Sequence, residues 1–201
     1  TICVGNLAVG GTGKTPMAEY LITLLSANYK VALLSRGYGR KTRGFRLANE
    51  HDTAQTIGDE PMQIHCRFPN LPVAVCADRV KGVKTLQHLF PDLQCIILDD
   101  AYQHRSLHCG FYILLTPYDC LYTNDHLLPW GRLRDLPNQS HRANVIVVTK
   151  CPTNMKPIDR RIVSNSLHLA SYQHLFYSSI QYTSLSTSTT PLVVTGIANP
   201  Q

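Results

Sequence analysis

The stretch Ala8-Val9-Gly10-Gly11-Thr12-Gly13-Lys14-Thr15 lies between the apolar run at residues 1–4 and a segment with the apolar spacing of a helix. The glycines let backbone N–H groups close around phosphate oxygens, and Lys14 can reach the β- and γ-phosphates of a nucleotide. The Thr15 hydroxyl is suited to bind Mg²⁺, and the following helix points the positive end of its dipole at the same anion. We therefore predict that residues 8–15 bind a nucleotide.

This pattern departs from the usual phosphate-binding loop at one position. Glycine is expected five residues before Gly13, and the chain has Ala8 there. An ordinary glycine-rich turn is the alternative interpretation. The loop by itself does not distinguish a kinase from a switch GTPase or an ATP-driven machine.

Short apolar runs alternate with helical patterns along the chain. The runs are typical of buried parallel strands and lie at 2–4, 31–34, 73–76, 95–98, 112–115, 145–148 and 192–194. The helical patterns place Met17, Tyr20, Leu21, Leu24 and Leu25 on one face, and Val80, Val83, Leu86 and Leu89 on another. This alternation predicts an α/β fold, a doubly wound and mostly parallel sheet of the P-loop NTPase type.

We expect a nucleotide-binding kinase domain at residues 1–170 and the start of a linker hairpin or smaller C-terminal region at 171–201. The second range includes a stretch rich in Ser, Thr and Tyr at 172–190. The chain opens within a strand without Met and stops soon after the run at 192–194. We therefore expect that both ends are truncated.

Composition narrows the classes of function. The 201 residues are 44% apolar and 16% charged, with a formal net charge of +6. A diffuse positive charge suits polyphosphates, a phosphorylated substrate or an anionic membrane surface, and without a long basic run it does not indicate nucleic acid. The seven cysteines form no C-x-x-C pair, which favours reduced thiols. We find no signal peptide and no apolar stretch long enough to span a bilayer.

A second candidate site follows the run at 95–98. Asp99 and Asp100 come directly after this predicted buried strand, which places carboxylates beside the phosphate-binding loop. We predict that Asp99, the first acid, binds the metal, and that Asp100 orients a water, a substrate group or Lys14. Read alone, the pair could also be a helix cap or a solvated turn.

Other polar clusters follow strands or begin helices. Arg36 and Arg40 lie in a glycine-containing loop and offer donors to anions. Asp59, in Gly-Asp-Glu-Pro at 58–61, is either an N-cap or a catalytic residue. Arg79 and the cluster Gln103-His104-Arg105 complete the set. His104 and His108 have helical spacing, but without the carboxylate of a metalloprotease motif a zinc site is not favoured.

Taken together, six segments resemble one family, the tetraacyldisaccharide 4'-kinases, which phosphorylate a lipid A precursor at the cytoplasmic face of the Gram-negative inner membrane. The segments are GNLAVGGTGKTP at 5–16, LSRGYGR at 34–40, GDEP at 58–61, DDAYQHR at 99–105, LLPWGRLRD at 127–135 and TGIANP at 195–200. Members of this family do not require Gly at the position of Ala8.

The resemblance implies ATP as co-substrate, with Mg²⁺, and a catalytic set of Asp59, Lys14 and Asp100. Asp59 would act as the base for the sugar 4'-hydroxyl, assisted by a histidine of an Asp-His-His motif that lies beyond the given sequence. Arg134 and Asp135 correspond to an Arg-Glu pair near the nucleotide and metal, and the shorter Asp135 casts doubt on direct metal binding. The family's N-terminal membrane-associating helix is also absent from the given sequence.

For the lipid disaccharide, Arg79 or Arg105 would bind the 1-phosphate; the full set of candidate substrate-binding residues is Arg36, Arg79, Gln103, His104, Arg105 and Arg134. The resemblance places the protein at the cytoplasmic side of the inner membrane, held peripherally or through the missing helix. A switch GTPase is disfavoured because Thr149-Lys150-Cys151-Pro152 replaces Asn-Lys-x-Asp and Tyr102 replaces a glycine. A non-catalytic nucleotide-binding module remains the other alternative.

Overall fold

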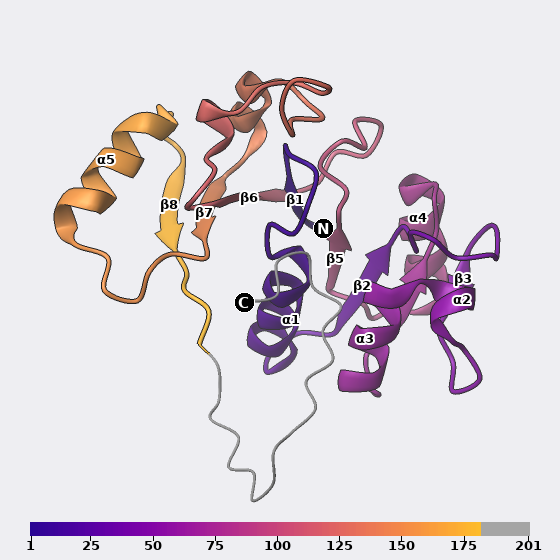
Figure 1. Ribbon diagram of the computed structural model, residues 1–201. Helices are drawn as coiled ribbons and strands as arrows, with labels where there is room; N and C mark the ends of the chain where they lie inside the picture. Colours follow the sequence, from indigo (N-terminus) through magenta and orange to yellow (C-terminus); the bar gives the residue numbers. More distant parts are fainter. Residues whose placement is uncertain (182–201) are drawn as a thin grey trace, which may run out of the picture.

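The computed structural model describes residues 1–181, which form an eight-stranded sheet with helices on both faces (Figure 1). The strand order is β3-β4-β2-β5-β1-β6-β7-β8, and every pair is parallel except β3 with β4. The strands are β1 (Ile2–Asn6), β2 (Val31–Ser35), β3 (Arg46–Leu47), β4 (Val73–Val75), β5 (Cys95–Asp99), β6 (Phe111–Pro117), β7 (Val145–Thr149) and β8 (His174–Tyr177).

Five α-helices connect these strands within the described residues. They are α1 (Lys14–Ser26), α2 (Ala54–Ile57), α3 (Asp59–Arg67), α4 (Arg79–Leu89) and α5 (Pro157–Leu167), and 3₁₀ turns lie at Tyr122–Asn124 and Pro137–Arg142. Figure 1 shows α2, α3 and α4 grouped at the β2–β4 end of the sheet and α5 beside β8 at the other end. Within residues 1–181, no helix has both the length and the apolar character needed to cross a membrane.

The hydrophobic core is split into two layers by the sheet, because neighbouring residues of a buried strand point to opposite faces. Leu33 of β2 packs in the layer that includes α1 and α3, whereas Leu34 packs in the layer that includes α4 and α5. Helices on both faces of a parallel sheet confirm the predicted doubly wound α/β fold.

Strands β1, β2, β4, β5, β6 and β7 fall at the predicted apolar runs, and the run at 192–194 lies outside the described residues. The sheet also has two strands that we did not predict. β3 is a two-residue antiparallel strand at one edge, and β8 pairs in parallel with β7 at the other edge, with Val145 opposite His174. The sheet thus continues past residue 170, and the proposed division of the chain at that point stays a prediction.

The buried face of α1 differs from the predicted one. Tyr20 and Leu24 are 61% and 54% exposed, whereas Ala18, Leu21 and Ile22 are buried. The helix packs over the middle of the sheet, so its core contact is broad and centred one position away from the predicted stripe.

A close contact fixes the end of β5 against β1. A Cβ at Gly5 would lie 2.5 Å from the Cβ of Tyr102, so only glycine leaves room for this fully buried tyrosine. Tyr102 also packs edge-on against Tyr112, with the two ring centroids 6.0 Å apart, and donates a hydrogen bond to the Gln139 carbonyl. The turn that carries Asp99 and Asp100 is therefore anchored directly beside the strand that leads into the phosphate-binding loop.

A buried carboxylate organises the β3–α2 region. The Asp52 side chain is fully buried and accepts hydrogen bonds from Arg46, the backbone N–H of Asn49 and the Thr56 hydroxyl. Burial alone would raise the pKa of Asp52, but these bonds outweigh it and hold the pKa below its ordinary value.

Candidate functional site

The predicted phosphate-binding loop connects β1 to α1 at the carboxyl edge of the sheet. Gly10 and Gly13 have φ angles of 104° and 88°, in the left-handed region that favours glycine. The Thr12 N–H bonds the Gly10 carbonyl at 3.0 Å, and the helix begins with a bond from Met17 N–H to the Gly13 carbonyl at 3.1 Å. The glycines therefore serve the conformation that the sequence pattern predicted for them.

Two polar residues outside the glycine pattern support this loop. The Asn6 side-chain amide donates to the Thr12 hydroxyl at 2.8 Å, and the Thr149 hydroxyl at the end of β7 donates to the Thr12 carbonyl at 2.9 Å. Asn6 and Thr149 are both buried. Sequence reasoning did not assign either residue to the site, although a buried amide at the end of a strand is the signal that could have found Asn6.

The segment 132–134 lies against the loop as a short strap. The Val9 N–H bonds the Arg132 carbonyl and the Arg134 N–H bonds the Leu7 carbonyl, both at 2.8 Å, and Ala8 forms a β-bridge with Leu133. This backbone pairing brings Arg134 into the site from a position far along the chain.

Asp100 stands at the centre of a charged cluster. Its carboxylate lies 4.0 Å from the Lys14 ammonium and accepts two hydrogen bonds from Arg134, one of them at 3.2 Å. Arg134 also donates to the Asn6 side-chain carbonyl at 2.5 Å. Burial would raise the pKa of Asp100, yet Arg134 and Lys14 hold it below its ordinary value. Of the roles predicted for Asp100, contact with Lys14 is the one that the structure shows.

Asp99 is the buried acid of the site. It is 1% exposed, its Oδ2 is 3.5 Å from the Ser35 hydroxyl, and its Oδ1 has no hydrogen-bond partner among the described residues. Burial, with the charges of Glu60 and Asp100, raises its pKa to about 7 against the opposing effect of Lys14 and Arg79. A buried carboxylate oxygen without a partner beside a phosphate-binding loop has the chemistry of a metal ligand.

Arg79 lies beneath this edge and is 2% exposed. Its guanidinium donates to the backbone carbonyls of Cys76, Ala77, Asp99 and Asp100. These bonds hold the ends of β4 and β5 together, so Arg79 positions the turn that carries Asp99 and Asp100. Its role in substrate binding stays a prediction.

Asp59 is the first residue of α3, and the N-cap is Gly58, so the interpretation of Asp59 as the cap is wrong. Gly58 has a φ of 97°, and a Cβ there would lie 3.0 Å from the Tyr38 carbonyl. The glycine-containing loop after β2 therefore packs against the start of α3. Asp59 itself is exposed at this edge, and its neighbour Glu60 is near enough to raise the pKa of Asp99.

The remaining predicted residues divide into two groups. Gln103 faces the site, because its amide donates to the Asn6 carbonyl at 2.8 Å. Arg105 instead pairs with Asp135 at 3.1 Å, and His104 contacts the Ser106 hydroxyl at 3.1 Å. Arg36 is exposed and lies close enough to lower the pKa of Arg79, although burial is the larger cause. No group of three or more potential metal-binding His, Cys, Asp and Glu side chains occurs in residues 1–181.

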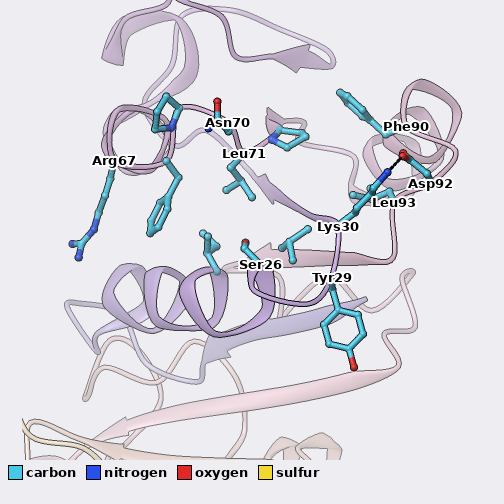
Figure 2. A pocket seen from close by; sticks show the side chains of 14 residues that line it. Ser26, Tyr29, Lys30, Arg67, Asn70, Leu71, Phe90, Asp92 and Leu93 are labelled. Carbon is cyan, nitrogen blue, oxygen red and sulfur yellow. Dashed lines mark hydrogen bonds and ion pairs between the residues drawn. The ribbon is translucent and has the colours of Figure 1, made fainter.

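A separate cavity lies at the opposite edge of the sheet. Its volume is about 590 Å³, and apolar residues such as Phe68 and Leu93 line it. Lys30 and Asp92 also line it and form an ion pair (Figure 2). Lys30 precedes β2, so the cavity is at the amino end of that strand, and none of the predicted site residues lines it.

The sheet and the glycine loop are those of the P-loop fold class, with paired acids at the end of the strand beside the loop. A more particular assignment comes from sequence comparison. The family model of tetraacyldisaccharide-1-P 4'-kinase, LpxK, matches residues 1–201, and the chain belongs to this family.

Individual relatives agree with this result. The chain is 46% identical to the tetraacyldisaccharide 4'-kinase of Bacteroides thetaiotaomicron, over 99% of this chain and 58% of that protein. It is 48% identical to that of Parabacteroides distasonis, over 99% of this chain and 59% of the relative. A crystal structure of Aquifex aeolicus LpxK in complex with ATP has 37% identity and a TM-score of 0.65, covering 73% of this chain and 47% of that one. The chain thus spans less than two thirds of the length of these relatives.

Proposed function

We propose that the protein is an ATP-dependent kinase that transfers the γ-phosphoryl group to the 4'-hydroxyl of a tetraacyldisaccharide 1-phosphate in lipid A biosynthesis. The observation that carries the proposal is that Lys14, at the end of the glycine loop, lies 4.0 Å from Asp100, at the end of β5. Membership of the family supports the choice of reaction, and the Aquifex aeolicus relative has been crystallised with ATP.

Each group in the site has a distinct task in this reaction. The loop N–H groups and Lys14 would bind the phosphates and offset the charge that develops on the transferred group. Asp59 would accept the proton of the sugar hydroxyl while the new oxygen–phosphorus bond forms. Arg134 and Asp100 hold each other, and Asp100 keeps the Lys14 ammonium at the loop.

Thr15 and Asp99 would hold Mg²⁺ at this site. The fit rests on the unpartnered, buried Oδ1 of Asp99 and on an all-oxygen donor set. Mg²⁺ is commonly held by one or two carboxylates together with substrate phosphates and water, so a cluster of several acids is not required. When bound, the ion would supply positive charge that offsets part of the negative charge of the phosphates.

The lipid substrate implies that the protein works at the cytoplasmic side of the bacterial inner membrane. The formal net charge of +6 supports contact with an anionic surface. Among the candidate substrate residues, Gln103 and Arg134 both bond Asn6, just before the loop, and Arg36 is exposed at the same edge.

The direct test is transfer of labelled γ-phosphate from ATP to a tetraacylated disaccharide 1-phosphate by the full-length protein. Label on the sugar 4'-position supports the kinase, and its loss in Lys14→Ala assigns the transfer to this loop. ATP hydrolysis without label on the sugar would instead indicate a nucleotide switch or motor. Binding of ATP without turnover would indicate a non-catalytic module.

A further inference from the structure

An apolar tip projects beside the nucleotide site. It consists of Leu127, Leu128, Pro129 and Trp130, and the tryptophan is 88% exposed while the leucines are 43% and 53% exposed. In Figure 1 the tip belongs to the looped segment between β6 and β7, at the top of the view. An indole that is almost fully in water on a well-defined loop is unusual, because tryptophan is buried on average.

The tip owes its shape to the backbone rather than to its apolar side chains. The Leu128 N–H bonds the Leu133 carbonyl at 2.9 Å, and the Trp130 N–H bonds the Leu127 carbonyl at 3.1 Å. A Cβ at Gly131 would overlap the His126 carbonyl, so glycine is required at the turn. The side chains of Leu128 and Trp130 are thus held outward and are not needed to close the loop.

The same segment is fastened to the phosphate-binding loop. Immediately after the tip, Arg132 accepts a bond from the Val9 N–H, and Leu133 forms the β-bridge to Ala8. Val9 adds a further 41% exposed apolar side chain at this junction. Whatever surface receives the tip must therefore lie next to the place where the nucleotide phosphates bind.

The chemistry of the tip fits a lipid bilayer. Exposed tryptophan and leucine are typical of residues that enter the membrane interface. The nearby Arg132 side chain is 53% exposed and pairs with Asp125 at 3.5 Å, so its charge is already partly offset. The formal net charge of +6 complements anionic headgroups. A stable protein partner would require roughly 20–30 residues on each side, far more than this tip offers.

We propose that the apolar tip at 127–130 inserts into the interface of an anionic lipid bilayer and so holds the phosphate-binding loop against the headgroup layer. The proposal rests on the proposed function, because a lipid substrate presents its sugar hydroxyl at that depth. A kinase that draws its acceptor from a membrane needs its γ-phosphate there. Docking by the tip would supply this alignment.

Trp130 is the single tryptophan of the chain, so its fluorescence reports the surroundings of the tip. With vesicles of phosphatidylcholine and phosphatidylglycerol, its emission should shift to the blue and be quenched by brominated acyl chains. Trp130→Ser should weaken partitioning into these vesicles by about tenfold. The matched control is Phe176→Ser on β8, which removes an aromatic side chain of 56% exposure and should leave partitioning unchanged.

Several results would overturn the proposal. Unchanged Trp130 emission in the presence of vesicles would do so. An equal loss of vesicle partitioning in Trp130→Ser and Phe176→Ser would do so as well. An emission shift produced by MgATP and not by vesicles would show that the indole meets the nucleotide instead. Kinase assays separate this inference from the proposed reaction: Trp130→Ser should retain turnover of detergent-dispersed substrate and lose turnover of substrate in vesicles. Vesicle binding by a chain without kinase activity would support the tip and refute only the reaction.

Discussion

The pair formed by Arg134 and Asp100 should contribute measurably to folding, and a double-mutant cycle can isolate that contribution. The changes are Arg134→Ala, Asp100→Asn and both together. Asparagine keeps the size of the aspartate while it removes the charge that Arg134 and Lys14 both face. The coupling energy is the difference between the sum of the two single losses in the free energy of unfolding and the loss in the double variant.

The structure sets the size of this coupling. The Arg134 and Asp100 side chains are 26% and 31% exposed, and two hydrogen bonds join them. Exposed ion pairs contribute about 0.2–1 kcal/mol, whereas charged hydrogen bonds contribute roughly 1.5–3 kcal/mol. A half-buried, doubly bonded pair lies between these cases, so we expect a coupling of about 1.5–2 kcal/mol.

Urea unfolding followed by circular dichroism measures the three variants and the unsubstituted chain. The matched control replaces Arg134→Ala with Arg105→Ala, because Arg105 pairs with Asp135 and not with Asp100. Its coupling to Asp100→Asn should fall within about 0.5 kcal/mol of zero. A coupling for Arg134 as small as that of the control would refute the cluster described here.

Four further changes test other parts of the structure. Asp59→Ala should lower turnover by about 10²–10⁴-fold and leave the KM for ATP nearly unchanged, and equal losses in steady-state kinetics would contradict its role as the base. Lys14→Ala should weaken both ATP binding, measured by calorimetry, and turnover. Asp52→Asn should reduce the free energy of unfolding by about 1–3 kcal/mol at neutral pH. Because hydrogen bonds lower the pKa of Asp52 in the folded chain, its stabilisation is present above the unfolded pKa of about 3.9 and is lost as pH falls through the folded value. The denaturation curves of Asp52→Asn and of the unsubstituted chain should therefore converge in acid. A loss of stability in Asp52→Asn that does not depend on pH would contradict this explanation. Gly5→Ala should lower stability by about 1–3 kcal/mol through overpacking, whereas Gly110→Ala, with only an ordinary contact at 3.6 Å, should change the melting temperature little.

The interior of the sheet could be predicted from the sequence, and its edges could not. Strands buried on both faces are continuous apolar runs, which is why 31–34 and 145–148 identified β2 and β7. β3 has two residues, and β8 alternates between exposed and half-buried side chains. Neither segment has a sequence pattern that distinguishes it from a loop. Each becomes a strand because it pairs with the adjacent strand of the sheet, β4 for β3 and β7 for β8.

The site shows the same division between local and long-range information. Gly10, Gly13 and the acids at the end of β5 could be predicted because turn geometry and strand ends are local properties. The bonds from Thr149 to Thr12 and from Arg134 to Asp100 span 137 and 34 positions, and no local pattern specifies such partners. The catalytic role of Asp59 and the metal role of Asp99 stay predictions.

The bond between Thr149 and Thr12 has a consequence for how this protein can change over time. β6 lies between β7 and β1, so the Thr149 hydroxyl reaches past a whole strand to hold the carbonyl in the glycine loop. If the loop binds nucleotide as proposed, replacements in β7 can change its affinity while every residue of the loop stays the same. Natural variation and inhibitor resistance both have a route to the site that leaves the residues of the loop unchanged.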